Sequence, residues 1–479
     1  MLKKTKICCT IGPSCDSVKI LTDMVKAGMN IARLNFSHGD YASHAALINN
    51  IRKTEEITGE PIAIMQDLQG PKIRVGSLPE AGVPIMVGDE IVFDTSLTEY
   101  KGKEIPLDYH DLHKFILPGQ RILVDDGHIE VKVKTVTGTK ITGIVVEGAL
   151  IFSHKGLNLP DSDLNIETLS EKDKEDLKFG VEQGVDLVAL SFVRSGKDIM
   201  DLRFLIKQHE SKLEQKNQQP IRLIAKIERR VAVDNLEEIL ETADGIMVAR
   251  GDLGMEVPAA EVPLVQKKMI DMANAHAKPV IVATQMLDSM RENRRPTRAE
   301  VSDVANAVID HADTLMLSNE TAVGKHPILV VETMADIIIS TEKSHYDDTA
   351  LPGIHKKGTS IDIAITELSR ILAEEVKAKI ILAASISGET GRMISHVRPP
   401  LYILVGTSSQ RTQRQLNLSW GVVPFILEPC SSIEELVERS ITYIKKHKIA
   451  KNGDNMVVVA GEPVGQAGNV NLVEVREIR

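Results

Sequence analysis

The sequence predicts an α/β protein built from a parallel (β/α)8 TIM barrel, a small inserted β-barrel domain and a C-terminal doubly wound α/β domain. Eight short apolar runs end abruptly in polar residues. A segment with a different pattern, in which apolar and polar residues alternate, separates the third run from the fourth. Further apolar runs alternate with helical segments near the C-terminus. A chain of 479 residues is long enough for two or three cores, because domains contain roughly 100 to 200 residues.

The eight runs of the predicted barrel are short and apolar on both faces, as parallel strands covered by helices are. They read KICCTIG, NIARLNFSHG, IAIMQD, DLVALSFVR, IRLIAKIE, GIMVARGD, PVIVATQ and TLMLSNE. Cys8 and Cys9 are adjacent in the first run, so their side chains should point to opposite faces of a strand. We expect the barrel to comprise residues 1–68 and 164–340.

Helix signals lie between these runs. One segment begins with Asp16 and Ser17, places apolar residues at helical spacing and reaches Gly28, which predicts a helix capped at both ends. Another begins with a capping box of Thr297 and Glu300 behind Pro296. Its predicted core face carries Val301, Val304, Ala305 and Val308.

The two other domains follow from different patterns. Residues 69–163 contain EIVFD, RILVDDGHIEVKVKTVTGTK and GIVVEG, whose alternation and Asp-Gly or Thr-Gly turns predict antiparallel hairpins. In residues 341–479 the runs AKIILAAS, LYILVGT, VVPFIL and MVVVAG alternate with helical segments, which predicts a doubly wound domain. The linker to it is expected near LPGIHKKG.

Composition excludes several classes of function. A net charge of −10 and a pI near 5.8 argue against binding nucleic acid or an anionic membrane, which requires clustered Lys and Arg. Four cysteines imply no disulfide framework and fit a reducing cytoplasm. The chain shows neither a signal peptide nor the ~18 apolar residues of a membrane span. We expect a soluble, cytoplasmic protein.

Polar residues stand at the end of almost every run of the barrel. Active sites of such barrels lie at the C-terminal ends of the strands, and protein interiors exclude unpaired charge. The residues concerned are Arg33, Asn35, Ser37, His38, Asp67, Lys226, Glu228, Arg250, Gly251, Asp252, Thr284, Gln285, Ser318 and Glu320. The barrel mouth is therefore the predicted active site.

Lys226 and Glu228 are two residues apart on a predicted strand, so both side chains face the same way while Ile227 faces the helices. Alone, the two residues are as consistent with a buried ion pair as with a functional site. Asp252 at the same mouth adds a second carboxylate, and paired carboxylates suit Mg²⁺ or Mn²⁺. The metal interpretation is therefore favoured.

Two further features predict anion binding. The turn ARGDLG offers consecutive backbone N–H groups before a predicted helix, which suits a substrate carboxylate. Arg33 can bind phosphate through two parallel hydrogen bonds, although an arginine at a barrel rim can also be a surface ion pair. The sequence has neither a Walker loop nor a GxGxxG motif, so a nucleotide would be held in another way.

Seven long segments resemble pyruvate kinase, in the same domain order and over the whole chain. They read TIGPSCDS, NIARLNFSHG, QDLQGPKIRVG, AKIERRVAVDNLEEIL, GIMVARGDLGMEVP, PVIVATQMLDSM and RRPTRAEVSDVANAV. The resemblance implies transfer of a phosphoryl group from phosphoenolpyruvate to ADP in glycolysis, which yields pyruvate and ATP. It also implies a homotetramer.

The resemblance implies a role for each matching residue at the mouth. Lys226 and Arg33 would bind the transferred phosphoryl group, and Lys226 would also stabilise the enolate. Thr284, with the amides of Gly251 and Asp252, would hold the carboxylate and shape the protonation site. Glu228 and Asp252 would ligate Mg²⁺ or Mn²⁺. The residues implied to contact the nucleotide are Asn35, His38, Arg74 and Lys155, and the inserted domain would act as a lid.

The sequence departs from the family where many relatives bind K⁺. That site uses residues matching Asn35, Ser37 and Asp67 followed by threonine, but Leu68 follows here. Relatives that need K⁺ usually carry glutamate where this chain has Lys72. An ammonium is a compact point charge that can replace a bound monovalent ion. We therefore expect Lys72 to lie in or near the ion site and the enzyme to work without K⁺.

A phosphorylated allosteric effector is expected in the C-terminal domain. The strand IILAAS continues into SISGETGR, where Ser385, Ser387, Gly388 and Thr390 offer hydroxyls and amides at a helix start. Relatives bind a sugar phosphate or nucleotide phosphate there. An ordinary capped turn is an equal alternative, and Glu389 would repel phosphate.

Two other functions compete with phosphoryl transfer. A metal-dependent aldolase-type barrel enzyme acting on phosphoenolpyruvate or pyruvate would share the carboxylate pair, but it would need neither the lid nor Lys155. A catalytically silent metabolite sensor would tolerate loss of Lys226, Arg33 or a metal carboxylate, and the chain retains all of them.

Overall fold

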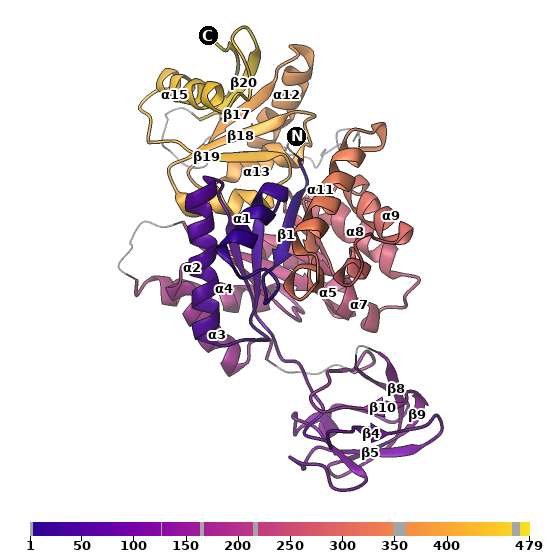
Figure 1. The fold of residues 1–479 in the computed structure, drawn as a ribbon. Coiled ribbons are helices and arrows are strands. Elements are labelled where there is room, and N and C mark those ends of the chain that lie inside the picture. The colour runs from indigo at the N-terminus through magenta and orange to yellow at the C-terminus, as the bar shows by residue number, and fades with distance from the viewer. Residues whose placement is uncertain (1–2, 126, 163–166, 214–218, 348–360, 462–469) are drawn as a thin grey trace.

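The computed structural model describes residues 3–125, 127–162, 167–213, 219–347, 361–461 and 470–479. Figure 1 shows three bodies, with the barrel in the middle and the inserted and C-terminal domains at its opposite ends. The predicted linker at 351–358 and the predicted boundary between 163 and 164 lie outside the described residues. Within the described ranges, no helix has the length and apolar character needed to cross a bilayer.

Eight parallel strands of the described residues close into one barrel, as predicted. They are β1 (Lys6–Thr10), β2 (Ile31–Asn35), β3 (Ala63–Asp67), β12 (Leu187–Leu190), β13 (Arg222–Ile227), β14 (Gly245–Ala249), β15 (Val280–Ala283) and β16 (Thr314–Leu317). Each strand pairs with its neighbours in chain order, and β16 pairs with β1 to close the ring. The carboxyl ends of all eight strands therefore meet at one mouth.

Helices surround the barrel. They are α1 (Val18–Ala27), α2 (Tyr41–Thr58), α3 (Glu171–Glu182), α4 (Gly196–Glu210), α5 (Arg230–Asp234), α6 (Leu236–Thr242), α7 (Arg250–Glu256), α8 (Val262–Ala275), α9 (Arg298–Ile309), α10 (Asn319–Ala322) and α11 (Pro327–Glu342). The predicted caps of α1 form, with Ser17 at its start and Gly28 at its end. The capping box of Thr297 and Glu300 also forms. One detail was wrong, because Val301 is exposed and Ala307 is buried instead.

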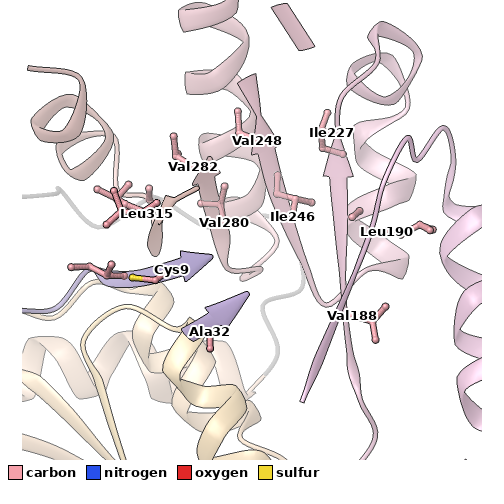
Figure 2. Close-up of a cluster of buried hydrophobic side chains, with 14 of the residues drawn as sticks. Cys9, Ala32, Val188, Leu190, Ile227, Ile246, Val248, Val280, Val282 and Leu315 are labelled. Carbon is pink, nitrogen blue, oxygen red and sulfur yellow. The ribbon is translucent and has the colours of Figure 1, made fainter. Parts of the chain in front are cut away.

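Two apolar layers hold the barrel together. Side chains that point inward, among them Cys8, Ile31 and Met65, fill its interior. Alternate residues of the same strands, such as Cys9, pack outward against the helices, and Figure 2 shows part of this outer layer. Cys8 and Cys9 thus face opposite sides as predicted, and Ile227 lies in the outer layer. Because neighbouring residues of a strand point to opposite faces, Lys226 and Glu228 on either side of Ile227 point away from the helices, toward the mouth.

The inserted domain leaves the barrel after β3 and returns before α3. Its strands are β4 (Val83–Pro84), β5 (Glu90–Asp94), β6 (Glu104–Pro106), β7 (Arg121–Val124), β8 (Ile129–Thr137), β9 (Lys140–Glu147), β10 (Leu150–Ile151) and β11 (Leu157–Asn158). The predicted hairpins pair β7 with β8 and β8 with β9. Its described strands form a curled half-barrel of six strands plus a two-stranded sheet, rather than a closed barrel.

The C-terminal domain has one sheet in the order β19-β18-β17-β20-β21. Its elements are α12 (Ile361–Glu375), β17 (Ile380–Ala384), α13 (Glu389–His396), β18 (Tyr402–Thr407), α14 (Gln410–Gln415), β19 (Val422–Ile426), α15 (Ile433–Lys446), β20 (Asn455–Ala460) and β21 (Leu472–Glu477). Helices α12 and α13 pack on one face, and α15 packs on the other. This is the doubly wound arrangement, but the sheet is mixed because the unpredicted edge strand β21 is antiparallel.

Candidate active site

Three charged side chains from three strands meet at the barrel mouth. Arg33 on β2 donates from Nε to Asp67 Oδ2 at 2.6 Å, and Lys226 Nζ on β13 lies 3.2 Å from Asp67 Oδ1. Asp67 at the end of β3 is only 2% exposed. Its burial opposes ionisation, but Lys226 and Arg33 outweigh that effect and hold the pKa of Asp67 below its ordinary value. The carboxylate therefore fixes both cations in place.

Lys226 is the centre of this network. Its Nζ lies 2.9 Å from Glu228 Oε1 and donates to Ser191 Oγ at 2.7 Å. Burial alone would lower the pKa of Lys226, but Asp67 and Glu228 raise it above its ordinary value. The ion pair of Lys226 with Glu228, which the sequence left open as an alternative to a metal site, is thus present, and the lysine is a fixed positive charge.

Glu228 is 1% exposed, and its Oε2 accepts the backbone N–H of Phe192 at 2.7 Å. Burial raises the pKa of Glu228, Lys226 lowers it, and the negative charge of Asp252 raises it further. Asp252 is in the first turn of α7, and its Oδ1 lies 3.7 Å from Lys72 Nζ. The two carboxylates are therefore close enough to repel each other.

This donor set fits a magnesium-like ion. Among the described residues no group of three or more His, Cys, Asp and Glu side chains could hold a metal. Mg²⁺ does not need such a group, because it usually binds one or two carboxylates and keeps waters or substrate phosphates as its other ligands. A cation between Glu228 and Asp252 would also remove their mutual repulsion.

Thr284 follows β15 in an unusual backbone conformation. Its φ is +72°, and that of Gln285 is +54°. A positive φ is a true outlier for a β-branched residue and costs about 1–3 kcal/mol. In this conformation Thr284 Oγ1 accepts the backbone N–H of Gly251 at 2.9 Å. The predicted turn and Thr284 therefore lie side by side at the mouth.

The four residues implied to contact a nucleotide are divided between two domains. Asn35 Oδ1 accepts the N–H of Ser37, and the carbonyl of His38 is 2.9 Å from His44 Nε2; both residues lie at the barrel mouth. Arg74 donates to the carbonyl of His154 at 3.1 Å, and Lys155 pairs with Asp125 at 2.8 Å, both within the inserted domain. In the described part of the chain, no hydrogen bond or ion pair joins the two groups.

The residues of the predicted monovalent-cation region have other partners here. Leu68 is fully buried, and its carbonyl accepts the hydroxyl of Ser191 at 2.6 Å. Lys72 pairs with Asp252. Within the described ranges no hydrogen bond or ion pair connects Lys72 to Asn35, Ser37 or Asp67. The structure thus places Lys72 beside a carboxylate of the predicted metal pair.

The predicted effector turn joins β17 to α13. Gly388 has φ +80° and precedes α13, and Thr390 is buried. Glu389 is paired with Arg392, which reduces the expected repulsion of phosphate. The carbonyl of Ser387 accepts from Arg222 NH2 at 3.3 Å. Arg222 begins β13, so the turn contacts the strand that carries Lys226 at its other end.

Sequence reasoning missed one residue that matters here and the contacts of another. Ser191 directly follows β12 inside the fourth run, and a search for polar residues at the end of that strand would have found it. Arg250 was named at the mouth, but the sequence gave no sign of its bonds to the loop after β15. Conversely, Glu320 is a structural residue: it is 1% exposed and accepts the backbone N–H groups of Leu287 and Ser318.

Comparisons with known proteins agree with this geometry. The family description "Pyruvate kinase, barrel domain" matches residues 2–331, and "Pyruvate kinase, alpha/beta domain" matches residues 363–476. The pyruvate kinase of Sporosarcina psychrophila is 42% identical over 100% of this chain and 81% of its own length. That of Mycobacterium tuberculosis is 41% identical over 100% of this chain and 99% of its own.

A solved structure shares the whole fold. The crystal structure of a pyruvate kinase from Cryptosporidium parvum superimposes with a TM-score of 0.92 at 34% identity, and the match covers 100% of this chain and 96% of that one. Sequence and fold thus match over all domains. The chain belongs to the pyruvate kinase family of phosphotransferases.

Proposed function

We propose that the chain transfers the phosphoryl group of phosphoenolpyruvate to ADP at the barrel mouth and so produces pyruvate and ATP. The observation that carries this reading is the buried network of Arg33, Asp67 and Lys226 beside Glu228. Phosphoryl transfer depends mainly on positioning and on stabilising negative charge. Two cations held in place before substrate arrives meet both needs.

Arg33 and Lys226 would bind the phosphoryl group. Arg33 keeps part of its guanidinium free of Asp67, since only Nε bonds that carboxylate and NH1 bonds Thr10. Lys226 is held charged and would face the phosphoryl group in transit and then the enolate that remains. The same ammonium would thus stabilise the phosphoryl group during transfer and the enolate after it.

Glu228 and Asp252 would hold Mg²⁺ or Mn²⁺, in keeping with a family that depends on divalent metals. Such an ion, when bound, supplies positive charge to the substrate oxygens and is neither oxidised nor reduced. The chain contributes two carboxylates, one of them 1% exposed and fixed by the Phe192 N–H. This arrangement leaves ligand positions for substrate and water.

The substrate carboxylate would lie against Thr284 and the first turn of α7. Gly251 and Asp252 lie in the first turn of α7, and the Gly251 amide donates to Thr284 Oγ1. The hydroxyl of Thr284 would then face the carbon that accepts a proton when the enolate becomes pyruvate.

The nucleotide would be held between two domains. Asn35 and His38 lie on the barrel, whereas Arg74 and Lys155 belong to the inserted domain, which stands apart from the barrel in Figure 1. Closure of this domain would bring all four residues to ADP. A closing lid also excludes water, which prevents hydrolysis.

We further propose that the reaction proceeds without K⁺. Lys72 has an ammonium 3.7 Å from Asp252, so a fixed positive charge already lies at the mouth. Leu68 offers no hydroxyl to a monovalent ion, and its carbonyl is engaged by Ser191. Both residues lie on the segment that begins the inserted domain.

The K⁺ proposal is tested by the initial rate against added KCl, with ionic strength held constant by a bulky quaternary ammonium salt. We expect a flat response. The Lys72→Glu variant should lose activity without K⁺, whereas reversal of the exposed Lys101 to Glu should not matter. Activation of the natural protein by about tenfold or more, or full K⁺-free activity in Lys72→Glu, would contradict the proposal.

The C-terminal domain would regulate the enzyme by binding a phosphorylated effector at Ser385, Ser387, Gly388 and Thr390. The turn's contact with Arg222 supports this role, because it connects the turn to the barrel. A homotetramer is proposed from the family alone. Light scattering at several protein concentrations would test the tetramer.

The overall reaction is tested by a coupled assay with phosphoenolpyruvate, ADP and Mg²⁺. Formation of ATP and pyruvate in equal amounts is the expected result. Condensation of pyruvate with an aldehyde and no ATP would favour the aldolase alternative. Ligand binding without any turnover would favour the silent sensor.

A further inference from the structure

Arg250 follows strand β14, and its side chain extends to the end of the neighbouring strand β15. It is the first residue of α7, and its side chain is only 13% exposed. Its Nη2 donates to the carbonyl of Thr284 at 2.6 Å, and its Nε donates to the carbonyl of Ala283 at 3.4 Å. One guanidinium therefore bonds two consecutive carbonyls at the end of β15.

The Thr284 carbonyl belongs to the strained part of the mouth. Thr284 and Gln285 both have positive φ, a conformation that a β-branched residue adopts only when its surroundings impose it. The Thr284 hydroxyl bonds the Gly251 amide on the same turn that carries Arg250. Thr284 is therefore held by two hydrogen bonds, one from Arg250 to its carbonyl and one from the Gly251 amide to its hydroxyl.

Arg250 is itself fixed from behind. Its Nη1 lies 2.7 Å from both carboxylate oxygens of Asp303 on α9 and 3.5 Å from Gln266 Oε1 on α8. The planar guanidinium offers five donors in a rigid fork, so it can bond the carboxylate and both carbonyls together. A lysine ammonium at this position has no such fork.

We propose that Arg250, anchored by Asp303, is a positioning residue that holds the Thr284 hydroxyl where the enolate is protonated. This inference rests on the proposed function. Arg250 points to backbone carbonyls and to Asp303, and therefore acts on the reaction only through Thr284. Its loss should let the loop relax to negative φ and withdraw the hydroxyl from the Gly251 amide.

The proposal separates two steps of the reaction. Phosphoryl transfer and most of the charge that binds phosphoenolpyruvate depend on Arg33 and Lys226, on β2 and β13, and the described residues show no bond from either to Arg250. Only the substrate carboxylate would lie against Thr284 and α7. Proton transfer to the enolate carbon depends on the placement of Thr284. Arg250 variants should therefore lose proton transfer much more than substrate affinity.

The test measures exchange of the pyruvate methyl protons in D₂O by NMR, with MgATP present, together with kcat and KM for phosphoenolpyruvate. We expect Arg250→Gln to lower exchange by roughly tenfold to a hundredfold, in line with the cost of small misplacements. The KM should change by less than about threefold. Exchange by Arg250→Lys and by Asp303→Asn should be more than about threefold slower than that of the natural protein, but faster than that of Arg250→Gln.

Arg203→Lys is the matched control, because Arg203 also bonds a backbone carbonyl, that of Thr242, and a carboxylate, that of Asp244. It should leave exchange unchanged. If Arg250→Gln fails to fold, Arg250→Lys and Asp303→Asn decide. Exchange within about threefold of the natural rate in these variants, or an equal loss of exchange and affinity, overturns the proposal. A natural protein that makes no ATP would instead refute the proposed function.

Discussion

Replacing Lys226 by alanine should lower turnover by at least ~10³, which corresponds to about 4 kcal/mol. Removal of one preorganised donor at a developing oxyanion costs roughly 2.7–4 kcal/mol. Lys226 carries a full charge, is 12% exposed at its side chain, and would face both the phosphoryl group and the enolate. The cost should therefore lie at or above the upper end of that range.

The same substitution should weaken folding without abolishing it. Breaking a buried ion pair costs about 3–5 kcal/mol when it leaves a charge without a partner. Here Asp67 keeps its bond to Arg33, and Glu228 keeps the Phe192 N–H and can take up a proton because burial already raises its pKa. The loss should lie near the lower limit, within the ~5–15 kcal/mol stability of a typical domain.

Rapid-quench measurement of ATP formed in a single turnover tests the chemical step directly. Mn²⁺ affinity, measured by electron paramagnetic resonance, should stay equal or rise, because the ammonium no longer competes for Glu228. Lys278→Ala is the control: Lys278 bonds the Ala243 carbonyl at the opposite end of the barrel, so its loss should cost stability only. If Lys226→Ala lost less than about tenfold, the lysine would be a structural ion pair and the assignment of the site would be wrong.

Two other predictions concern the C-terminal domain and its contact with the barrel. Sugar phosphates or AMP should shift the phosphoenolpyruvate saturation curve, and Thr390→Ala should remove the shift; an unchanged response would refute the effector site. Acid should destabilise the fold between pH 6.5 and 4, because burial, with Arg398 nearby, lowers the pKa of His311 to about 4. In this pH range the histidine is protonated in the unfolded chain and neutral in the folded chain. The free energy of unfolding therefore falls by about 1.4 kcal/mol for each unit that the pH is lowered. His311→Asn, which suits the φ of +66° there, should flatten this slope in urea titrations, and an unchanged slope would contradict the assignment.

Much of the fold could be predicted because the local pattern of apolar residues in each strand reflects the position of that strand in the barrel. A parallel strand covered on both faces must be apolar along its length, so Ile7 to Cys9 mark a strand without reference to its neighbours. The mouth follows from the same rule, since parallel strands end together. Lys226 and Glu228 could therefore be placed side by side from their spacing alone.

The parts that could not be predicted depend on contacts between distant segments. Arg250 and Asp303 are 53 positions apart, and no periodicity connects them. The positive φ of Thr284 is imposed by its neighbours, because threonine by itself avoids this conformation. Asp67 was assigned to the region where many relatives bind K⁺, but its bonds to two cations become visible only when β2, β3 and β13 close into a barrel.

The charges at the mouth explain why this site should need a divalent ion. Three cations, Arg33, Lys72 and Lys226, are paired with three carboxylates, Asp67, Glu228 and Asp252. The charges of these six side chains therefore balance, whereas phosphoenolpyruvate and ADP are both anions. They would compete with the carboxylates for the same cations, and a buried carboxylate left alone is costly.

Lys226 and Lys72 can turn toward phosphate only if Glu228 and Asp252 gain another positive partner. A divalent ion bound by both carboxylates would meet that need, while Asp67 keeps its bond to Arg33. Glu228 and Asp252 would therefore do more than provide metal ligands. They pair with Lys226 and Lys72, and the metal would have to bind before these two cations could turn toward the substrate.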